Sequence, residues 1–314
     1  MTRSFRRAAT LAALVFAVYA PAALAHTGPA PTPNSVWSSW SFEPLLLAVL
    51  VLAGWSYAVG VRVLWSRAGA GGGIERWRVA CFAAGMLALV IALISPLDGL
   101  SAALFSAHMA QHMLLILVAA PLLMLGAPGT ALLWALPLVG RRGVGRWWKQ
   151  SRWARALWHA CTRLGAAWAI AAAALWAWHA PALYQAALKS EPLHVLEHAS
   201  FLLTSCLFWW TLLRRGTHGR MGAGIVAVFA MALQGGALGA LLTFSAAPWY
   251  PAYAANTAAY GLSPLDDQQL AGLIMWIPAG AGYLLAACGL FLAWLSAVEA
   301  EDRRREAGAA PFPR

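Results

Sequence analysis

Charged residues are scarce in this chain: they make up 11% of its 314 residues, whereas 61% are hydrophobic. Soluble domains carry about 25% charged residues, so the composition excludes an ordinary soluble protein and points to a membrane. Acidic residues are scarcer than basic ones, 11 against 22, which gives a net charge of +11. The four cysteines are far apart and form no C-x-x-C pair. The sequence therefore predicts neither a disulfide framework nor a thiolate metal site.

The N-terminus has the layout of a secretory signal. Arginines precede an apolar stretch, and the tripeptide at residues 23–25, Ala-Leu-Ala, matches an A-x-A cleavage site. We therefore expect residues 1–25 to be a signal peptide that is cleaved to leave His26 as the first residue. Residues 26–42 would then form a periplasmic segment.

Seven hydrophobic runs follow, each near or above the ~18 apolar residues that read as a membrane-spanning helix. They cover residues 43–65, 78–96, 104–126, 165–184, 194–213, 223–244 and 270–297. The sequence predicts an all-α fold, a polytopic membrane helix bundle with seven transmembrane helices in residues 43–297 and a cytoplasmic tail at 298–314. The run 129–139 is too short to cross, and we expect it to extend or re-enter near the cytoplasmic face.

Basic residues lie almost entirely on one side of this topology. Of the 22 lysines and arginines, three lie in the signal, and Lys189 is the one placed on the outer side. The others lie in the loops 62–78, 141–163 and 214–220 and in the tail. The positive-inside rule then predicts a bacterial inner-membrane protein with a periplasmic N-terminus and a cytoplasmic C-terminus. Basic residues beside anionic lipid also account for the charge without a nucleic-acid partner.

Five of the eight histidines fall at the periplasmic ends of three predicted helices. His108 and His112 form one pair, His194 and His198 form another, and His179 lies near the end of the fourth helix. Residues four apart lie on the same face of a helix, and ionisable residues in membrane segments are costly and usually functional. The pattern predicts a metal or haem site between these helices. Interhelical hydrogen bonding by the same histidines is the alternative.

Several neighbours could take part in such a site. Met109 adds a thioether, which favours Cu(I), although methionine also serves as pliable packing. Glu197 is either a ligand or a partner that orients a ligating ring. Asp98, Asp266 and Asp267 lie on the same side, where they either cap helices or attract a cation or a basic partner.

Six blocks of sequence occur in a distinctive order. They are SPLDGL (95–100), SAHMAQHMLL (106–115), APLLMLGAP (120–128), WHAPALYQAAL (178–188), HVLEH (194–198) and DDQQLAGLIMWIP (266–278). In these blocks the sequence resembles the CtaG-type cytochrome c oxidase assembly factors, over residues 40–297. The resemblance implies a multi-helix membrane protein that supports the maturation of haem–copper oxidases at the copper step. Its partners would be cytochrome c oxidase subunits, within the lipid bilayer.

The resemblance also carries the family's motif residues onto this chain. The motif histidines fall on His108, His112, His179, His194 and His198, and the acidic motif falls on Asp266.

Together these patterns predict copper bound by the four paired histidines, with His179 or Met109 completing or exchanging the ligand set. Three alternatives stay open: a haem held between His112 and His198 in an electron carrier or enzyme, a copper transporter, and a metal-free chaperone. The sequence has no recognisable set of nucleophile, base and acid, so we do not expect an enzyme and identify no small-molecule substrate.

Overall fold

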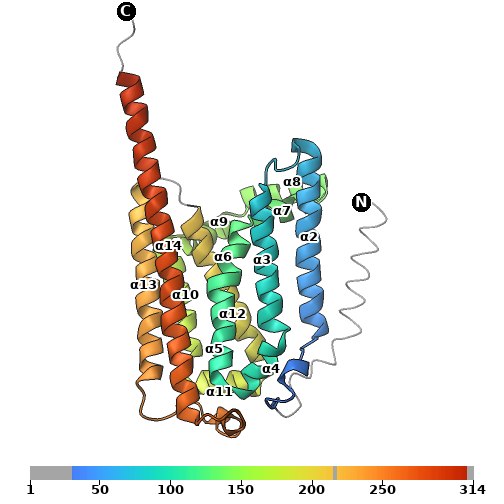
Figure 1. The fold of residues 1–314 in the computed structure, drawn as a ribbon. Helices are drawn as coiled ribbons and strands as arrows, with labels where there is room; N and C mark the ends of the chain where they lie inside the picture. The colour runs from blue at the N-terminus through green and yellow to red at the C-terminus, as the bar shows by residue number, and fades with distance from the viewer. Residues whose placement is uncertain (1–29, 215–217, 310–314) are drawn as a thin grey trace, which may run out of the picture.

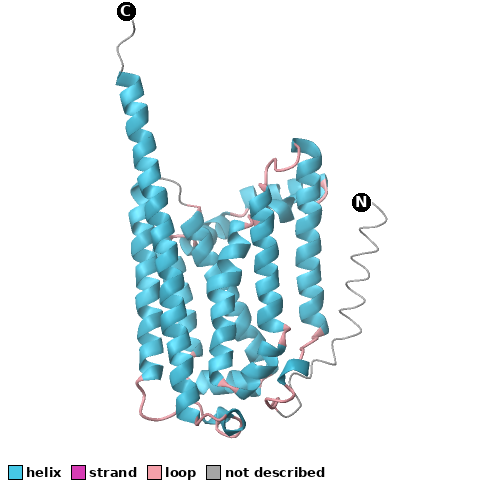
Figure 2. Cartoon of the chain, viewed as in Figure 1, coloured by secondary structure: helices cyan, strands magenta, loops and turns pink. Residues whose placement is uncertain are grey.

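The computed structural model describes residues 30–214 and 218–309, and within these ranges the chain contains helices and no strand (Figure 2). The all-α prediction is therefore confirmed. The predicted signal peptide, its cleavage site and His26 lie outside the described residues.

The long helices run roughly parallel and antiparallel, and shorter ones cap the ends of the bundle (Figure 1). In chain order the α-helices are α2 (Pro44–Ala68), α3 (Arg76–Leu93), α4 (Pro96–Ala103), α5 (Phe105–Met113), α6 (Ala120–Leu125), α7 (Pro128–Ala135), α8 (Leu138–Gln150), α9 (Arg152–Cys161), α10 (Leu164–Trp178), α11 (Pro181–Lys189), α12 (Glu191–Leu213), α13 (His218–Thr243) and α14 (Pro264–Ala309). Short 3-10 turns η1 (Val36–Ser38), η3 (Pro251–Tyr253) and η4 (Thr257–Tyr260) and the π-helix η2 (Leu114–Ala119) complete the described elements.

Six spans in the described ranges are long and apolar enough to cross a membrane, and a seventh exists if the bent pair α9 and α10 is counted as one. These two helices meet at 75°. The fourth predicted span, 165–184, extends too far at its C-terminal end, because α10 ends at Trp178 and a separate helix, α11, begins at Pro181. Proline disfavours the helical conformation in the residue before it, and Ala180 is accordingly extended.

The third span, Phe105–Leu125, lies at the centre of the bundle and contains a π-helical stretch. One face packs into the core formed with α10, α12, α13 and α14, and the other into the core formed with α2, α3 and α7. Pro121 has no N–H to donate. In a π-helix this N–H would bind the carbonyl five residues earlier, so the Ile116 carbonyl is left without a backbone donor. Trp209 Nε1–H donates to this carbonyl at 3.0 Å and so satisfies it from α12.

Helices α13 and α14 form a closely packed hairpin. A Cβ on Gly239 would lie 2.8 Å from the Gly272 carbonyl oxygen, and a Cβ on Gly272 would lie 2.5 Å from that of Gly239. Small residues allow membrane helices to approach closely. This packing fixes the start of α14, which in turn anchors α5 as described below.

The two ends of the bundle differ in composition. Helices α8 and α9, rich in arginine and tryptophan, lie toward the end opposite to α4 and α11 (Figure 1). The short run at 129–139 divides between α7, which packs on α2, and the beginning of α8. Helix α14 continues past residue 297 without a break, so the expected tail starts as an extension of the last span.

Candidate metal centre

The four paired histidines converge in one small volume. Their ring centroids lie 4.3 Å apart within each pair, and 5.1–5.6 Å apart for His108–His194, His108–His198 and His112–His198. The potential ligand atoms form two groups, and within each group they all lie within 4.8 Å of one another. The first group is His108, His112 and His198, and the second is His108, His194 and Glu197. We call these four histidines with Glu197 the imidazole cluster. His108 belongs to both groups.

The imidazole cluster is buried except for His194, which is partly exposed, and it has polar atoms that lack hydrogen bonds. His108, His112 and Glu197 are 0% exposed, and His198 is 9% exposed. Among the described residues, His108 Nε2, both His112 nitrogens and both Glu197 carboxylate oxygens have no hydrogen-bond partner. Each buried polar atom left in this way costs about 1–3 kcal/mol. Imidazole nitrogens with a nearby carboxylate are a donor set that fits a transition-metal ion.

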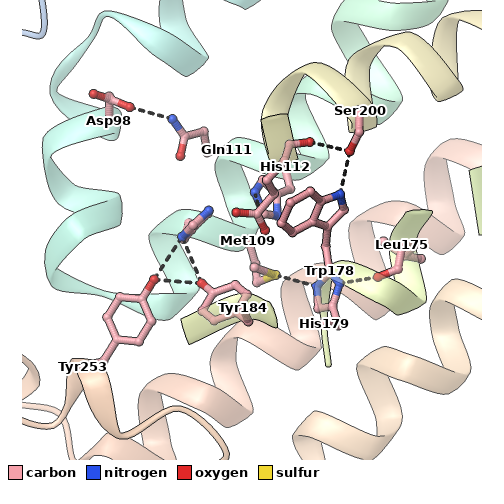
Figure 3. A network of polar contacts seen from close by, with 12 residues as sticks. Asp98, Met109, Gln111, His112, Leu175, Trp178, His179, Tyr184, Ser200 and Tyr253 are labelled. Atoms are coloured by element: carbon pink, nitrogen blue, oxygen red, sulfur yellow. Dashed lines mark hydrogen bonds and ion pairs between the residues drawn. The ribbon is translucent and has the colours of Figure 1, made fainter. Parts of the chain in front are cut away.

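Two tyrosines orient His108. Its Nδ1 lies 2.9 Å from the hydroxyl of Tyr184 on α11 and 2.9 Å from that of Tyr253 on η3, and the two hydroxyls are 2.8 Å apart (Figure 3). Burial raises the pKa of both Tyr184 and Tyr253 well above 10, so both stay protonated. When Nδ1 carries the ring proton, a tyrosine oxygen accepts it and the Nε2 lone pair faces the cluster.

His179 and Met109 lie beside the imidazole cluster and contact each other. His179 Nδ1–H donates to the Leu175 carbonyl at 2.7 Å, and Nε2 lies 3.3 Å from the Met109 sulfur (Figure 3). Burial lowers the pKa of His179 to about 4, so the ring is neutral at pH 7. Its centroid is 6.3 Å from that of His112, and His179 belongs to neither ligand group.

A second hydrogen-bonded chain joins α10 to α12 next to the cluster. Trp178 Nε1–H donates to Ser200 Oγ at 2.7 Å, and the Ser200 hydroxyl donates to the Glu197 carbonyl at 2.8 Å (Figure 3). The end of α10, which carries His179, is thereby held against the turn of α12 that carries Glu197.

Asp98 positions α5 from the side facing α3. Gln111 donates through Nε2 to Asp98 Oδ1 and to the Ala92 carbonyl, both at 2.8 Å, and the Ser41 hydroxyl donates to Asp98 Oδ2. Gln111 lies between His108 and His112 in sequence. Asp98 therefore acts on the scaffold that carries the two histidines.

The adjacent residues Asp266 and Asp267 have different roles. Asp266 is exposed and caps its own helix, accepting from the Ser263 hydroxyl at 2.6 Å and from its N–H at 3.1 Å. Asp267 is buried and accepts from the N–H groups of Phe105 and Ser106, at 2.7 and 3.1 Å, and from the Ser106 hydroxyl. It thus caps α5, whose N-cap position, Leu104, has no capping side chain.

Sequence reasoning missed the two tyrosines and Gln111. Tyr184 was visible within the WHAPALYQAAL block, three residues after the proline that starts α11. Tyrosine is common at membrane interfaces, however, and its separation from His108 by 76 residues gave no sign of contact.

The fold and this site define a polytopic membrane protein with a buried cluster of imidazoles near one end of its bundle. Residues 55–297 match the family model for the cytochrome c oxidase caa3 assembly factor, and the chain belongs to this family. Two uncharacterized proteins, from Mycobacterium bovis and Mycobacterium tuberculosis, are each 27% identical to it over 288 residues. The match covers 87% of this chain but 41% of the mycobacterial proteins, so the chain spans less than half of their length. No solved structure matches.

Proposed function

We propose that this protein binds copper in the imidazole cluster and supplies it during the assembly of cytochrome c oxidase. Membership of the assembly-factor family supports the second part. The observation that carries the first is the buried set of nitrogen and oxygen atoms without hydrogen-bond partners on His108, His112 and Glu197. A bound cation could take one nitrogen from each imidazole and a carboxylate oxygen as ligands, which would remove much of the cost of leaving these atoms unsatisfied. The role is that of an assembly factor rather than an enzyme.

The proposed location is the periplasmic side of the bacterial inner membrane. The imidazole cluster lies toward the end of the bundle where α4 and α11 are found, away from the basic helices α8 and α9 (Figure 1). The positive-inside rule assigns the basic end to the cytoplasm. Copper would then be held where it can be passed to an oxidase subunit from the outer face.

The test is the metal content of the purified full-length protein after incubation with copper. We expect bound copper in the wild type and a clearly lower copper content in the His112→Ala/His198→Ala variant. His159→Ala is the matched control, because His159 is exposed on α9. Equal copper content in the wild type and the double variant would show that the site is elsewhere.

The same preparation separates the alternatives. A haem between His112 and His198 would give a Soret band, but their centroids are 5.1 Å apart and His108 lies within 5.6 Å of both rings, which favours an ion over a porphyrin. A metal-free chaperone would support normal oxidase assembly in cells after all five histidines are replaced. Copper handling predicts that these cells make an oxidase deficient in copper.

A further inference from the structure

Met109 and His179 place two electron-pair donors against each other with no hydrogen between them. The Leu175 carbonyl can only accept, so the His179 proton that it binds is on Nδ1. A neutral imidazole has one ring proton, and the Nε2 lone pair therefore faces the Met109 sulfur at 3.3 Å. Met109 is 0% and His179 is 2% exposed. Ordinary methionine packing does not account for two lone pairs held face to face in a buried site.

The two donor atoms define the kind of ion that would lie there. A thioether is a soft ligand that favours Cu(I), whereas Mg²⁺ and Ca²⁺ take oxygen ligands. An imidazole nitrogen also binds Cu(I), and both ligands are uncharged, which suits a monovalent ion in a buried site. A cation between the nitrogen and the sulfur would turn the repulsion of their lone pairs into two coordinate bonds.

A cavity next to this pair has the same chemical character. It has room for about 30 Å³ and is lined in part by three methionines from three helices, Met113, Met231 and Met275. A single water needs about 10–15 Å³, so this space is large enough for an ion or a few waters. The cavity adjoins the pair, because Leu175 and Phe201 line it, and Phe201 packs its ring against those of His179 and His112.

We propose that Met109 and His179 form a second, sulfur-containing site that takes Cu(I) between the imidazole cluster and the methionine-lined cavity. The inference rests on the proposed function only for the source of the ion, which reaches the pair from the cluster. Copper stays monovalent throughout, so no oxidant or reductant is involved. Met109 lies one residue from His108 on α5, so the movement between the two sites is short.

The experiment titrates the purified full-length protein with Cu(I) under anaerobic conditions, against a chromogenic Cu(I) chelator, and identifies the ligand atoms by X-ray absorption. Met109→Leu removes the sulfur and conserves side-chain volume. Met86→Leu is the matched control, since Met86 is on α3 in the other core. His112→Ala/His198→Ala removes the cluster and leaves the pair.

We expect two Cu(I) per wild-type chain with sulfur among the ligands, and one in Met109→Leu with nitrogen and oxygen ligands alone. The control should match the wild type, and the cluster variant should keep one ion with a sulfur ligand. If copper in the wild type has no sulfur ligand, or if copper in Met109→Leu keeps one, the proposal of a second site is wrong. Neither result would contradict copper binding by the imidazole cluster. Loss of both ions in the cluster variant would also overturn the second site. Absence of Cu(I) from every protein would overturn both proposals.

Discussion

His108 has more influence on the imidazole cluster than any other of its members, because it belongs to both ligand groups. Its orientation depends on hydroxyls from two distant segments, Tyr184 on α11 and Tyr253 on η3. A hydrogen bond to the second ring nitrogen fixes which nitrogen faces a metal and raises the basicity of the ligand. The hydroxyls of these tyrosines would therefore tune the proposed copper site without being ligands in it.

Replacing Tyr253 with phenylalanine removes one of these hydroxyls and keeps the aromatic ring, which packs against Phe105. Loss of a hydrogen bond that orients a ligand weakens metal binding by about 10–100-fold. We expect a copper dissociation constant raised toward the lower end of this range, because the Tyr184 hydroxyl still contacts His108 Nδ1, measured by competition with a chelator, and a nearly unchanged helix content. Tyr260→Phe serves as the control, since the Tyr260 hydroxyl donates to Pro31. Equal affinities in the two variants would mean that Tyr253 does not orient His108.

Glu197 is a buried carboxylate, and its Oε1 lies 3.8 Å from His112 Nε2. Glu197→Gln keeps the shape of the side chain and removes a carboxylate oxygen that an ion would take as a ligand. Without metal, we expect an equal or higher melting temperature, because a buried carboxylate without hydrogen bonds is removed. A ligand at 100 times its dissociation constant raises the free energy of unfolding of the protein that binds it by about 2.7 kcal/mol. If a variant binds the ligand about 100-fold more weakly, the same ligand concentration raises this free energy by only about 0.4 kcal/mol.

Thermal unfolding with and without copper measures both effects. The exposed Glu299→Gln provides the comparison. If Glu197→Gln keeps the full copper-induced increase in melting temperature, the carboxylate is not part of the metal site.

The convergence of the histidines could be anticipated from their spacing, since two i, i+4 pairs at matching depth have few other uses in an apolar chain. The tyrosine partners could not, because their contacts with His108 join residues 76 and 145 positions apart. Nothing in the local pattern of η3 distinguishes Tyr253 from an interfacial aromatic residue.

At the scale of elements, the apolar runs predicted the helices well but their ends less well. The span 165–184 was placed across the break at Ala180, although Pro181 was visible, because hydropathy does not register a change of direction. The π-helix was also missed. Pro121 indicates a disturbed helix, but the Trp209 indole that satisfies Ile116 comes from a helix 93 residues away.

Asp267 connects two elements, since it lies on α14 and caps α5, the helix that carries His108 and His112. Asp267→Ala leaves the first N–H groups of α5 buried without their acceptor. Loss of an N-cap costs about 0.5–2 kcal/mol, and we expect a lower melting temperature together with weaker copper binding. Asp266→Ala is a closely matched control, because Asp266 is exposed and caps only its own helix. A larger effect on copper binding from Asp266→Ala than from Asp267→Ala would contradict this role.

For the whole molecule, the third span joins two cores that share few other elements. Phe105, Met109 and Met113 pack on the side of α10 and α12, whereas Leu115 and Ala119 pack on the side of α2 and α3. The most buried of the six spans, with 56% of its apolar window inside, is thus the one that carries His108 and His112. Composition predicted a bundle, but which helix lies at its centre depends on packing between segments far apart in the sequence.

Charge asymmetry makes a prediction about the orientation of the whole chain. Ser35 is exposed and directly precedes η1, which packs on α4, and Arg142 is exposed on α8. Helices α4 and α8 lie toward opposite ends of the bundle (Figure 1). In a background with the four native cysteines replaced, we expect Ser35→Cys in intact spheroplasts to react with a membrane-impermeant maleimide. Arg142→Cys should react only after the membrane is permeabilised, because the positive-inside rule places the basic helices in the cytoplasm. The opposite pattern would put the imidazole cluster on the cytoplasmic side, where it would hold copper for delivery from within the cell.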